Sequence, residues 1–392
     1  MPATELKNIV VIGGSSAGIA SALNWRDDPI SSHRMIIVEQ KSHYNYVYAF
    51  PRASVKPGIE RELFVPYANL FYSNKNIGQV VQAKVIAIHP NYIELDRSVE
   101  DFGKSIPFTH LIFATGTTIP APGHFNADSK ADGVACLKTY QDLIRQSKKP
   151  LIIGGGAVGL ELAAEIKDFY PEKDVTLIHS RERYLQVYKS SLHTLTFGLL
   201  KNKLGVNQIL GDRVVVPKGG FSLEVKPITV RTTKGRTIET DLPITCIGMT
   251  PNTNLMAELS PQTLNLHTRF IQVKSTMQIK DDRYPHIYAA GDVIESTDVK
   301  TGHFAWYQSL AALHNIRLQI NADSELQPYV SKGVAIIKIA LGDKKAVMQT
   351  NVFGPLITLP SWIVGGSVPD NLYADFPWAW IGLPCDEEHK SL

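Results

Sequence analysis

Short apolar runs that do not alternate with polar residues are the strongest pattern in the chain. Lys7–Ile12 and Pro150–Ile153 are two such runs, and a glycine-rich loop follows each of them directly. Continuous aliphatic runs of this length predict strands that are buried on both faces of a parallel sheet. A segment of small residues such as Ile19–Leu23 comes after the first loop and predicts a helix packed closely on the sheet. The order strand, glycine loop, helix occurs twice in the chain. It predicts two βαβ units of an α/β fold.

The first glycine-rich loop has the residue types of a dinucleotide-binding turn. Gly13 makes the tight turn, Ser15 stands where backbone must approach a pyrophosphate, and Gly18 allows close contact between helix and strand. The N-terminus of the following helix offers unpaired N–H groups and a positive dipole to the phosphates. The predicted phosphate-binding residues are Gly13, Gly14, Ser15, Ser16, Ala17 and Gly18.

A carboxylate at the end of the next predicted strand fits the same kind of site. Residues Arg34–Val38 form this strand, and Glu39 follows it, 21 residues after Gly18. A carboxylate in this place accepts hydrogen bonds from the hydroxyls of a ribose. The alternative is a plain glycine turn followed by a solvated glutamate.

The second loop keeps all three glycines of the dinucleotide fingerprint, Gly154, Gly156 and Gly159. After the strand Asp174–Ile178, the sequence reads His-Ser-Arg where an NAD-selective site has an acidic residue. Arg181 and the Ser180 hydroxyl can bind a 2′-phosphate, which a carboxylate would repel. Because Glu182 can instead serve the ribose, both NADH and NADPH stay open as the predicted cofactor.

Two further strand ends are predicted to return the chain to the first loop. Residues Phe108–Gly116 end in Ala-Thr-Gly, which brings Gly116 beside that loop, and residues 283–292 end in Gly-Asp. Asp292 can hold ribityl or ribose hydroxyls, and a helix that begins near Ala305 can direct its positive end at a flavin. Between these segments, residues 80–88 and 92–95 predict an antiparallel meander.

The order of the segments predicts two Rossmann-like dinucleotide-binding domains and a small C-terminal α+β region. The flavin domain is split over residues 1–122 and 265–322, the nicotinamide domain occupies residues 123–264, and residues 323–392 form the C-terminal region. Two dinucleotides held face to face suit hydride transfer from a nicotinamide to a flavin. Glu161, one turn into the second helix, is expected to tune the flavin or to pair with a cation; the alternative is a helix-surface carboxylate.

Composition excludes several other classes of protein. The formal net charge of +3 and the absence of a Lys/Arg cluster argue against a nucleic-acid partner. Cys136, Cys246 and Cys385 are widely spaced, so neither a dithiol relay nor a metal site is predicted, and no nucleophilic side-chain constellation is found. The first residues lack an apolar signal stretch and no run of 18 apolar residues occurs, which together predict a cytoplasmic protein without a spanning helix.

Three stretches of the sequence indicate a particular family and not only a fold. They are Arg52–Val55, Pro107–Gly116 and Tyr170–Ser180. They resemble the two-dinucleotide-binding flavoproteins of the glutathione-reductase-like fold. Within these they are similar to the apoptosis-inducing-factor-like branch, which includes ferroptosis suppressor proteins and fungal homologues. The resemblance spans residues 6–320.

The resemblance implies non-covalent FAD, NAD(P)H as donor, and a quinone-like acceptor or O2. By position, it assigns FAD binding to the 13–18 loop, Glu39, Arg52, the backbone of Val85 and Asp292. An arginine also offsets pyrophosphate charge. The alternative for Arg52 is a salt bridge with Glu60 or Glu62.

The chain departs from this branch in three places. Position 2 is Pro2 rather than the glycine of lipid-anchored members, residues 302–308 differ from the ferroptosis suppressors, and the tail from about 325 matches poorly. The aromatic residues of the tail leave open an acceptor pocket, a dimer face, a peripheral membrane contact or plain core packing. Two other functions stay open, a flavin enzyme acting on a secondary metabolite and a redox-sensing cell-death effector. Monomer and homodimer are both compatible with the sequence.

Overall fold

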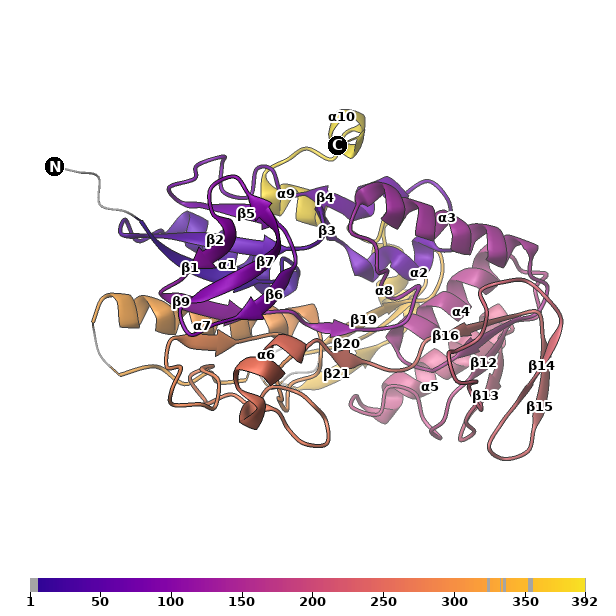
Figure 1. Ribbon diagram of the computed structural model, residues 1–392. Helices are drawn as coiled ribbons and strands as arrows, with labels where there is room; N and C mark the ends of the chain where they lie inside the picture. The colour runs from indigo at the N-terminus through magenta and orange to yellow at the C-terminus, as the bar shows by residue number, and fades with distance from the viewer. Residues whose placement is uncertain (1–5, 323–324, 332, 334–335, 352–354, 392) are drawn as a thin grey trace.

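The computed structural model describes residues 6–322, 325–331, 333, 336–351 and 355–391. Figure 1 shows two α/β lobes side by side, with the C-terminal segment in contact with both. The α/β fold class predicted from the glycine loops is confirmed, with one parallel sheet in each lobe. The domain bounds at residues 122, 264 and 322 remain a prediction.

The first lobe is built on a five-stranded parallel sheet in the order β18-β9-β1-β2-β5. Its strands are β1 (Lys7–Ile12), β2 (His33–Glu39), β5 (Gly78–Gln82), β9 (His110–Phe113) and β18 (Ile287–Ala289). The central strands are buried on both faces, which explains their continuous aliphatic sequence. Strand β18 comes from late in the chain and pairs with β9, so the predicted return to the first lobe is confirmed.

Two helices far apart in sequence pack together on this sheet. They are α1 (Ser16–Asp27) and α7 (Gly302–Ile320), and α7 begins three residues before the predicted start at Ala305. Small side chains let the two helices approach closely: the Ser21 and Ser309 hydroxyls lie 2.5 Å apart, and the Ser309 hydroxyl donates to the Ala17 carbonyl at 2.6 Å. The N-terminal ends of both helices are thereby held next to each other.

The predicted meander over residues 80–95 is wrong in its first part. Strand β5 pairs in parallel with β2 in the main sheet, and only β6 (Val85–Ile88), β7 (Tyr92–Val99) and β8 (Gly103–Pro107) form the antiparallel sheet. The chain leaves the main sheet where the Ala83 amide donates to the Glu39 carbonyl at 3.0 Å. A continuous apolar run cannot show this break, because hydrophobicity does not identify the strand's partner.

The second lobe contains a four-stranded parallel sheet in the order β13-β12-β11-β16. The strands are β11 (Pro150–Ile153), β12 (Thr176–Ile178), β13 (Asn207–Ile209) and β16 (Leu242–Thr245), with the hairpin β14 (Ile228–Arg231) and β15 (Thr237–Thr240) beside them. The helices are α3 (Lys130–Gln146), α4 (Ala157–Phe169) and α5 (Ser190–Leu199). The smaller elements between and around the lobes are β3 (His43–Asn45), α2 (Phe50–Ala53), β4 (Phe64–Pro66) and α6 (Asn254–Leu259).

The two chain crossings between the lobes are tied to each other. Strand β10 (Thr117–Thr118) pairs antiparallel with β17 (Thr250–Pro251). Beside this pair, the Thr115 hydroxyl donates to the Asn252 carbonyl at 2.7 Å, and the Asn252 side-chain amide donates to the Thr115 carbonyl at 2.8 Å. The segments that follow β9 and β16 therefore lie against each other.

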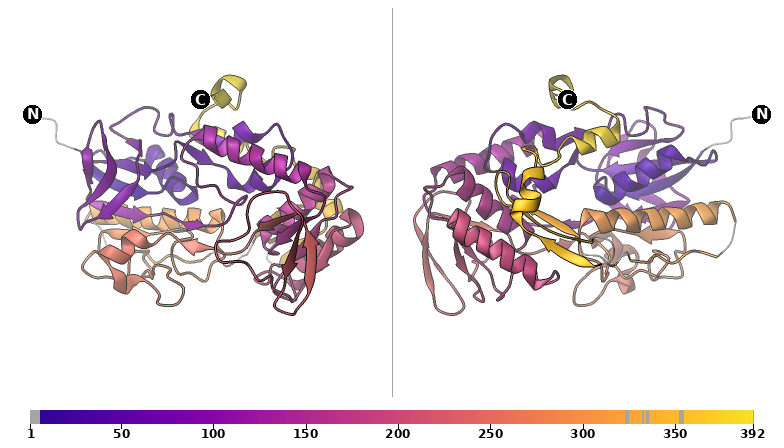
Figure 2. Two further views of the ribbon diagram at one scale, coloured as in Figure 1. Left: turned by 45° about the vertical axis from the view of Figure 1, so that its right-hand side comes forward. Right: turned by 180° about the vertical axis from the view of Figure 1, so that it is seen from behind.

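The C-terminal region has the predicted α+β composition. Strands β19 (Ile337–Ala340), β20 (Ala346–Asn351) and β21 (Leu356–Leu359) form an antiparallel sheet, which Figure 2 (right) shows between the lobes. The helices are α8 (Ser361–Val364), α9 (Phe376–Ile381) and α10 (Glu387–Ser391). The apolar run over 334–341 predicts a strand there, and β19 lies within it; residues 334–335 are outside the described residues.

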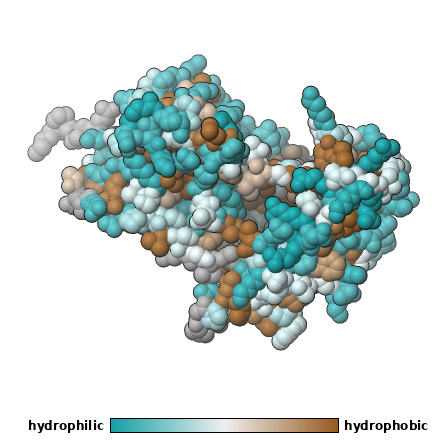
Figure 3. Space-filling view, turned by 90° about the horizontal axis from the view of Figure 1, so that it is seen from below, coloured by the Kyte–Doolittle hydropathy of each residue, from teal (hydrophilic) through white to brown (hydrophobic). Residues whose placement is uncertain are grey.

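The aromatic residues of this tail occupy different environments. Trp378 is fully buried and donates its indole N–H to the Glu62 carbonyl at 2.8 Å, whereas Trp362 is 84% exposed. On the face in Figure 3, hydrophobic residues are scattered among hydrophilic ones. Core packing is thus confirmed for Trp378. None of the helices in the described part of the chain has the length and apolar character needed to cross a bilayer.

Candidate dinucleotide sites

The first glycine loop has the strained backbone that its sequence predicts. Gly13 has φ +109° and donates its amide to the Val38 carbonyl at 2.9 Å, and a Cβ there would overlap the Ala114 carbonyl oxygen. A Cβ on Gly18 would overlap the Gly13 carbonyl oxygen. Both positions therefore require glycine for steric reasons alone. Ser15 has extended backbone and precedes the first turn of α1.

Glu39 lies against this loop, as its spacing predicts. Its carboxylate accepts hydrogen bonds from the Gly14 amide at 2.6 Å and from the Lys41 amide at 3.0 Å. Tyr67 lies beside Glu39 at the same glycine and donates its hydroxyl to the Gly14 carbonyl at 2.9 Å. Sequence analysis missed Tyr67, because no motif marks a tyrosine whose partner is 53 residues away. Glu39 is held where a ribose carried by the loop would meet it.

The start of α7 brings a third segment to the same place. A Cβ on Gly302 would overlap the Tyr48 hydroxyl, and the Ser16 hydroxyl would lie 2.7 Å from that Cβ. A Cβ on Gly291 would lie 3.4 Å from the Ala17 Cβ, so the segment that ends in Asp292 also borders the first loop. Burial raises the pKa of Asp292, and Lys300 partly offsets this shift. Tyr48, which sequence analysis also missed, marks the point where the three segments meet.

These residues fit an FAD. The loop offers a main-chain cradle and a helix N-terminus for the pyrophosphate, Glu39 a carboxylate for the ribose, and Asp292 a second carboxylate near the α7 N-terminus. Gly116 has φ +62°, and no atom would lie within 4 Å of a Cβ there, so this residue borders open space. Val85 begins β6, two residues after the Ala83 amide that bonds to Glu39, so its predicted backbone contact with FAD stays a proposal.

The second loop repeats the geometry of the first. Gly154 has φ +122°, and a Cβ on it would lie 2.5 Å from the Cys246 carbonyl oxygen. A Cβ on Gly159 would overlap the Gly154 carbonyl oxygen, while nothing would lie within 4 Å of a Cβ on Gly156. The middle glycine therefore borders open space, which is the place of a pyrophosphate in the dinucleotide fingerprint.

Gly156→Ala is expected to weaken NAD(P)H binding without unfolding the protein. Gly156 has φ −81°, which alanine adopts freely, so its Cβ would meet only the incoming nucleotide. We expect a loss of affinity of about tenfold, or roughly 1.4 kcal/mol, in a nucleotide titration. Gly159→Ala is the matched comparison and should lower stability by roughly 1–3 kcal/mol, because its Cβ has no room. Unchanged nucleotide affinity in Gly156→Ala would contradict the assignment of this loop.

Ser180 and Arg181 are both exposed at the end of β12. Arg181 donates to the Gln186 side-chain oxygen at 3.0 Å, a contact that a bound anion can replace. The Glu182 carboxylate packs against Gly211, after β13. Their contact with a nucleotide stays a proposal.

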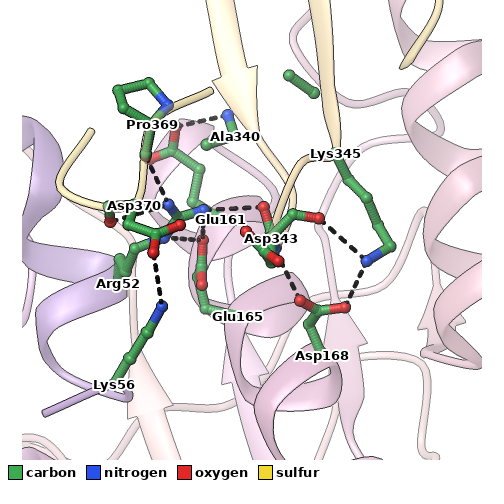
Figure 4. A network of polar contacts seen from close by, with 12 residues as sticks. Arg52, Lys56, Glu161, Glu165, Asp168, Ala340, Asp343, Lys345, Pro369 and Asp370 are labelled. Carbon is green, nitrogen blue, oxygen red and sulfur yellow. Dashed lines mark hydrogen bonds and ion pairs between the residues drawn. The ribbon is translucent and has the colours of Figure 1, made fainter. Parts of the chain in front are cut away.

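Arg52 lies in a buried polar network rather than at the first loop. Figure 4 shows it between α4 and the C-terminal region, where its guanidinium forms an ion pair with Glu165 at 2.8 Å. It also donates to the carbonyl oxygens of Gly342, Pro369 and Asp370 at 2.8, 3.1 and 3.2 Å. Because all three of its nitrogens donate to protein oxygens, these contacts do not support the predicted role at an FAD pyrophosphate.

The alternative prediction, a salt bridge of Arg52 with Glu60 or Glu62, is wrong, because Arg52 pairs with another glutamate. Glu60 accepts from Gln141, and Glu62 pairs with Lys390 at 2.9 Å. The real partner, Glu165, is 113 residues from Arg52, which no local pattern indicates.

Glu161 lies at the edge of the same network and is partly buried, so it is not an ordinary surface carboxylate. The Ala340 amide of β19 is 3.4 Å from its Oε1 atom. Burial raises the pKa of Glu161 to about 8, with Glu165 adding to the shift and both Ala340 and Arg52 opposing it. The group therefore gains or loses a proton near neutral pH.

The three cysteines are free and distant in sequence from one another. Burial raises the pKa of the Cys246 thiol to about 12, so this group stays protonated.

Two dinucleotide loops, one on each of two parallel sheets, are typical of the class of two-dinucleotide-binding flavoproteins. Comparison with known proteins agrees. Residues 7–312 match the model of the family described as pyridine nucleotide-disulphide oxidoreductase. The chain belongs to this family and is an NAD(P)H-dependent oxidoreductase that uses FAD.

Its similarity to individual proteins extends over most of its length. It is 30% identical to Fe-regulated protein 8 of Mycosarcoma maydis, covering 99% of this chain and 98% of that protein. It is also 30% identical to ferroptosis suppressor protein 1 of Homo sapiens, covering 88% and 89%. Among solved structures, the sulfide:quinone oxidoreductase of Aquifex aeolicus matches with a TM-score of 0.73 at 19% identity, covering 96% and 91%.

Proposed function

We propose that this protein takes hydride from NAD(P)H onto its flavin and passes the electrons to a quinone-like acceptor or to O2. The observation that carries the proposal is the link between Thr115 and Asn252, beside the paired strands β10 and β17. Dinucleotides bind at the carboxyl ends of parallel strands. Since the chain segments leaving the carboxyl ends of β9 and β16 are tied together, nucleotides bound to the two sheets would face each other.

The protein's own part in this reaction is to hold and orient. The first loop, Glu39 and Asp292 would position the flavin, and the N-terminus of α7 would stabilise negative charge that develops on it. The second loop would position the nicotinamide. One protein of the same fold supports the quinone acceptor: the Aquifex aeolicus protein is a sulfide:quinone oxidoreductase. A cytoplasmic location remains a prediction, and monomer and homodimer both stay open.

Glu161 is proposed to tune the flavin through its protonation state. With a pKa of about 8, the carboxyl is neutral below that pH and ionised above it. A negative carboxylate near the flavin opposes the charge gained on reduction, so reduction by NAD(P)H should slow as the pH rises through about 8. In Glu161→Gln the rate should lose this dependence, as measured by anaerobic stopped-flow absorbance.

The stability of Glu161→Gln at different pH values tests the raised pKa of Glu161. The pKa of about 8 in the folded protein lies above the ordinary value of 4.5, so between these pH values the folded state binds more protons than the unfolded state. The free energy of unfolding of the wild type therefore falls as the pH rises in this window, and Glu161→Gln should avoid that fall. The melting temperatures of the two proteins are measured between pH 5 and 8.5. If both change with pH in the same way, Glu161 is an ordinary carboxylate.

The test of the proposed function is an anaerobic absorbance spectrum before and after NADH or NADPH. We expect bleaching of a flavin band, followed by reoxidation on addition of a short-chain quinone. A flavin band that neither donor bleaches would contradict hydride transfer. Bleaching without reoxidation by quinone or O2 would contradict only the acceptor, and would favour a specific organic substrate.

A further inference from the structure

The two glycine loops can be compared residue by residue, because two successive amides of each loop donate to equivalent positions. Gly13 donates to the Val38 carbonyl and Gly154 to the Ile178 carbonyl, both at 2.9 Å. The next residue then donates to a side chain after the strand: Gly14 to Glu39 Oε2 at 2.6 Å, and Gly155 to His179 Nδ1 at 3.1 Å. His179 therefore occupies, in the second site, the place of Glu39 in the first.

The contact also decides which form of the imidazole is present. Because Nδ1 accepts a hydrogen bond from the Gly155 amide, a neutral His179 carries its proton on Nε2. Burial lowers the pKa of His179, and the nearby Arg181 adds to this shift, so the ring is neutral at neutral pH. A neutral ring with one N–H donor does not repel a phosphate, whereas a carboxylate does.

The surrounding groups favour an anion in the same place. The exposed Arg181 and Ser180 follow His179 directly, and the half-exposed Arg183 donates to the Gln186 carbonyl at 3.2 Å. The nearby Glu182 is also exposed, and its carboxylate lies next to Gly211, after β13. Guanidinium groups are well suited to bind a phosphate group.

We propose that the second site selects NADPH over NADH, with His179 as the residue that admits the 2′-phosphate and Arg181 as the residue that binds it. This inference rests on the proposed role of the second loop as the nicotinamide-dinucleotide site. Glu39 reads the ribose diol of FAD in the first site, and the same place has lost its carboxylate in the second. One fold thus presents two dinucleotide sites with opposite preference for a 2′-phosphate.

Calorimetric titration with adenosine 2′,5′-bisphosphate and with AMP tests this selectivity without any flavin chemistry. The intact wild-type protein should bind the bisphosphate at least about tenfold more tightly than AMP. His179→Glu, which restores the carboxylate of the first site, should abolish this ratio, and His179→Asn, which stays neutral, should largely keep it. Equal binding of the two probes to the wild type would overturn the proposal.

A second variant keeps the test decisive if His179→Glu does not fold. Arg181→Ala changes an exposed side chain and should reduce bisphosphate binding by about tenfold while leaving AMP binding unchanged. An unchanged ratio of affinities in this variant would overturn the assignment of Arg181. Selective probe binding in a protein whose flavin neither donor bleaches would contradict the proposed function alone, so the two failures are distinguishable.

Discussion

Arg52→Ala is expected to lower the free energy of unfolding by about 3–5 kcal/mol. The side chain of Arg52 is 2% exposed and is paired with Glu165, which is also buried. Its removal leaves that carboxylate without a cation and three C-terminal carbonyl groups without a donor. Denaturant unfolding followed by tryptophan fluorescence measures the change, and hydrogen exchange should show the largest loss of protection in the C-terminal region.

Lys56→Ala provides the matched control for this prediction. Lys56 also reaches the C-terminal region from just after α2, but its nitrogen is 3.8 Å from the Asp370 carboxylate, and the two side chains are 35% and 72% exposed. An exposed pair of this kind contributes about 0–1 kcal/mol. If the two alanine variants differ from the wild type by the same small amount, the buried network does not hold the C-terminal region in place.

A double variant separates the cost of an unpaired charge from the value of the pair. Arg52→Met combined with Glu165→Leu replaces both charges with apolar groups, and such replacements are often neutral or stabilising. We therefore expect the double variant to be more stable than Arg52→Ala. A double variant as unstable as the single one would mean that the hydrogen bonds to the C-terminal carbonyl groups dominate.

Asp292→Ala is expected to weaken FAD binding by about 10–100-fold, because the variant loses a carboxylate that would accept hydrogen bonds from the cofactor. Asp292 follows β18 and borders the first loop and the start of α7. The measurements are the flavin-to-protein ratio after purification and the dissociation constant of added FAD. Asp292→Asn, which keeps the shape and one acceptor, should lie between the wild type and the alanine variant.

Asp282→Ala is the control for this second prediction. Asp282 lies on the segment leading into β18, but its side chain is 94% exposed and contacts Lys274 at the surface. Its removal should leave flavin content unchanged. If Asp292→Ala also has normal flavin content, the assignment of Asp292 is contradicted. The role of the α7 segment in cofactor binding is then contradicted as well.

The Arg52 network has a consequence for the architecture as a whole. Arg52 lies on α2 between the lobes, Glu165 on α4 of the second lobe, and Gly342 and Pro369 in the C-terminal region, so one guanidinium links these three parts. Asp168 extends the network through Lys345 at 2.7 Å (Figure 4). Burial raises the pKa of Glu165, and the Arg52 guanidinium opposes that shift.

Where the contacts are local in sequence, the residues by themselves determined the structure. The bounds of β1 and β11 agree with the predicted strands, since an aliphatic run ended by glycine is both buried and sterically terminated. Gly13, Gly18, Gly154 and Gly159 act through positive φ angles or close backbone contacts that no other residue tolerates. Glu39 was predictable because its distance from the loop is set by one helix and one strand.

Only the tertiary structure decided which distant groups meet and how deeply they are buried. The partner of Arg52, the raised pKa of Glu161 and the pairing of residues 80–82 with β2 each depend on segments far away in the chain. The burial of Trp378 and the exposure of Trp362 depend equally on what packs against them. Hydrophobicity and charge say what a side chain needs, but desolvation and pairing energies arise only when the chain folds around it.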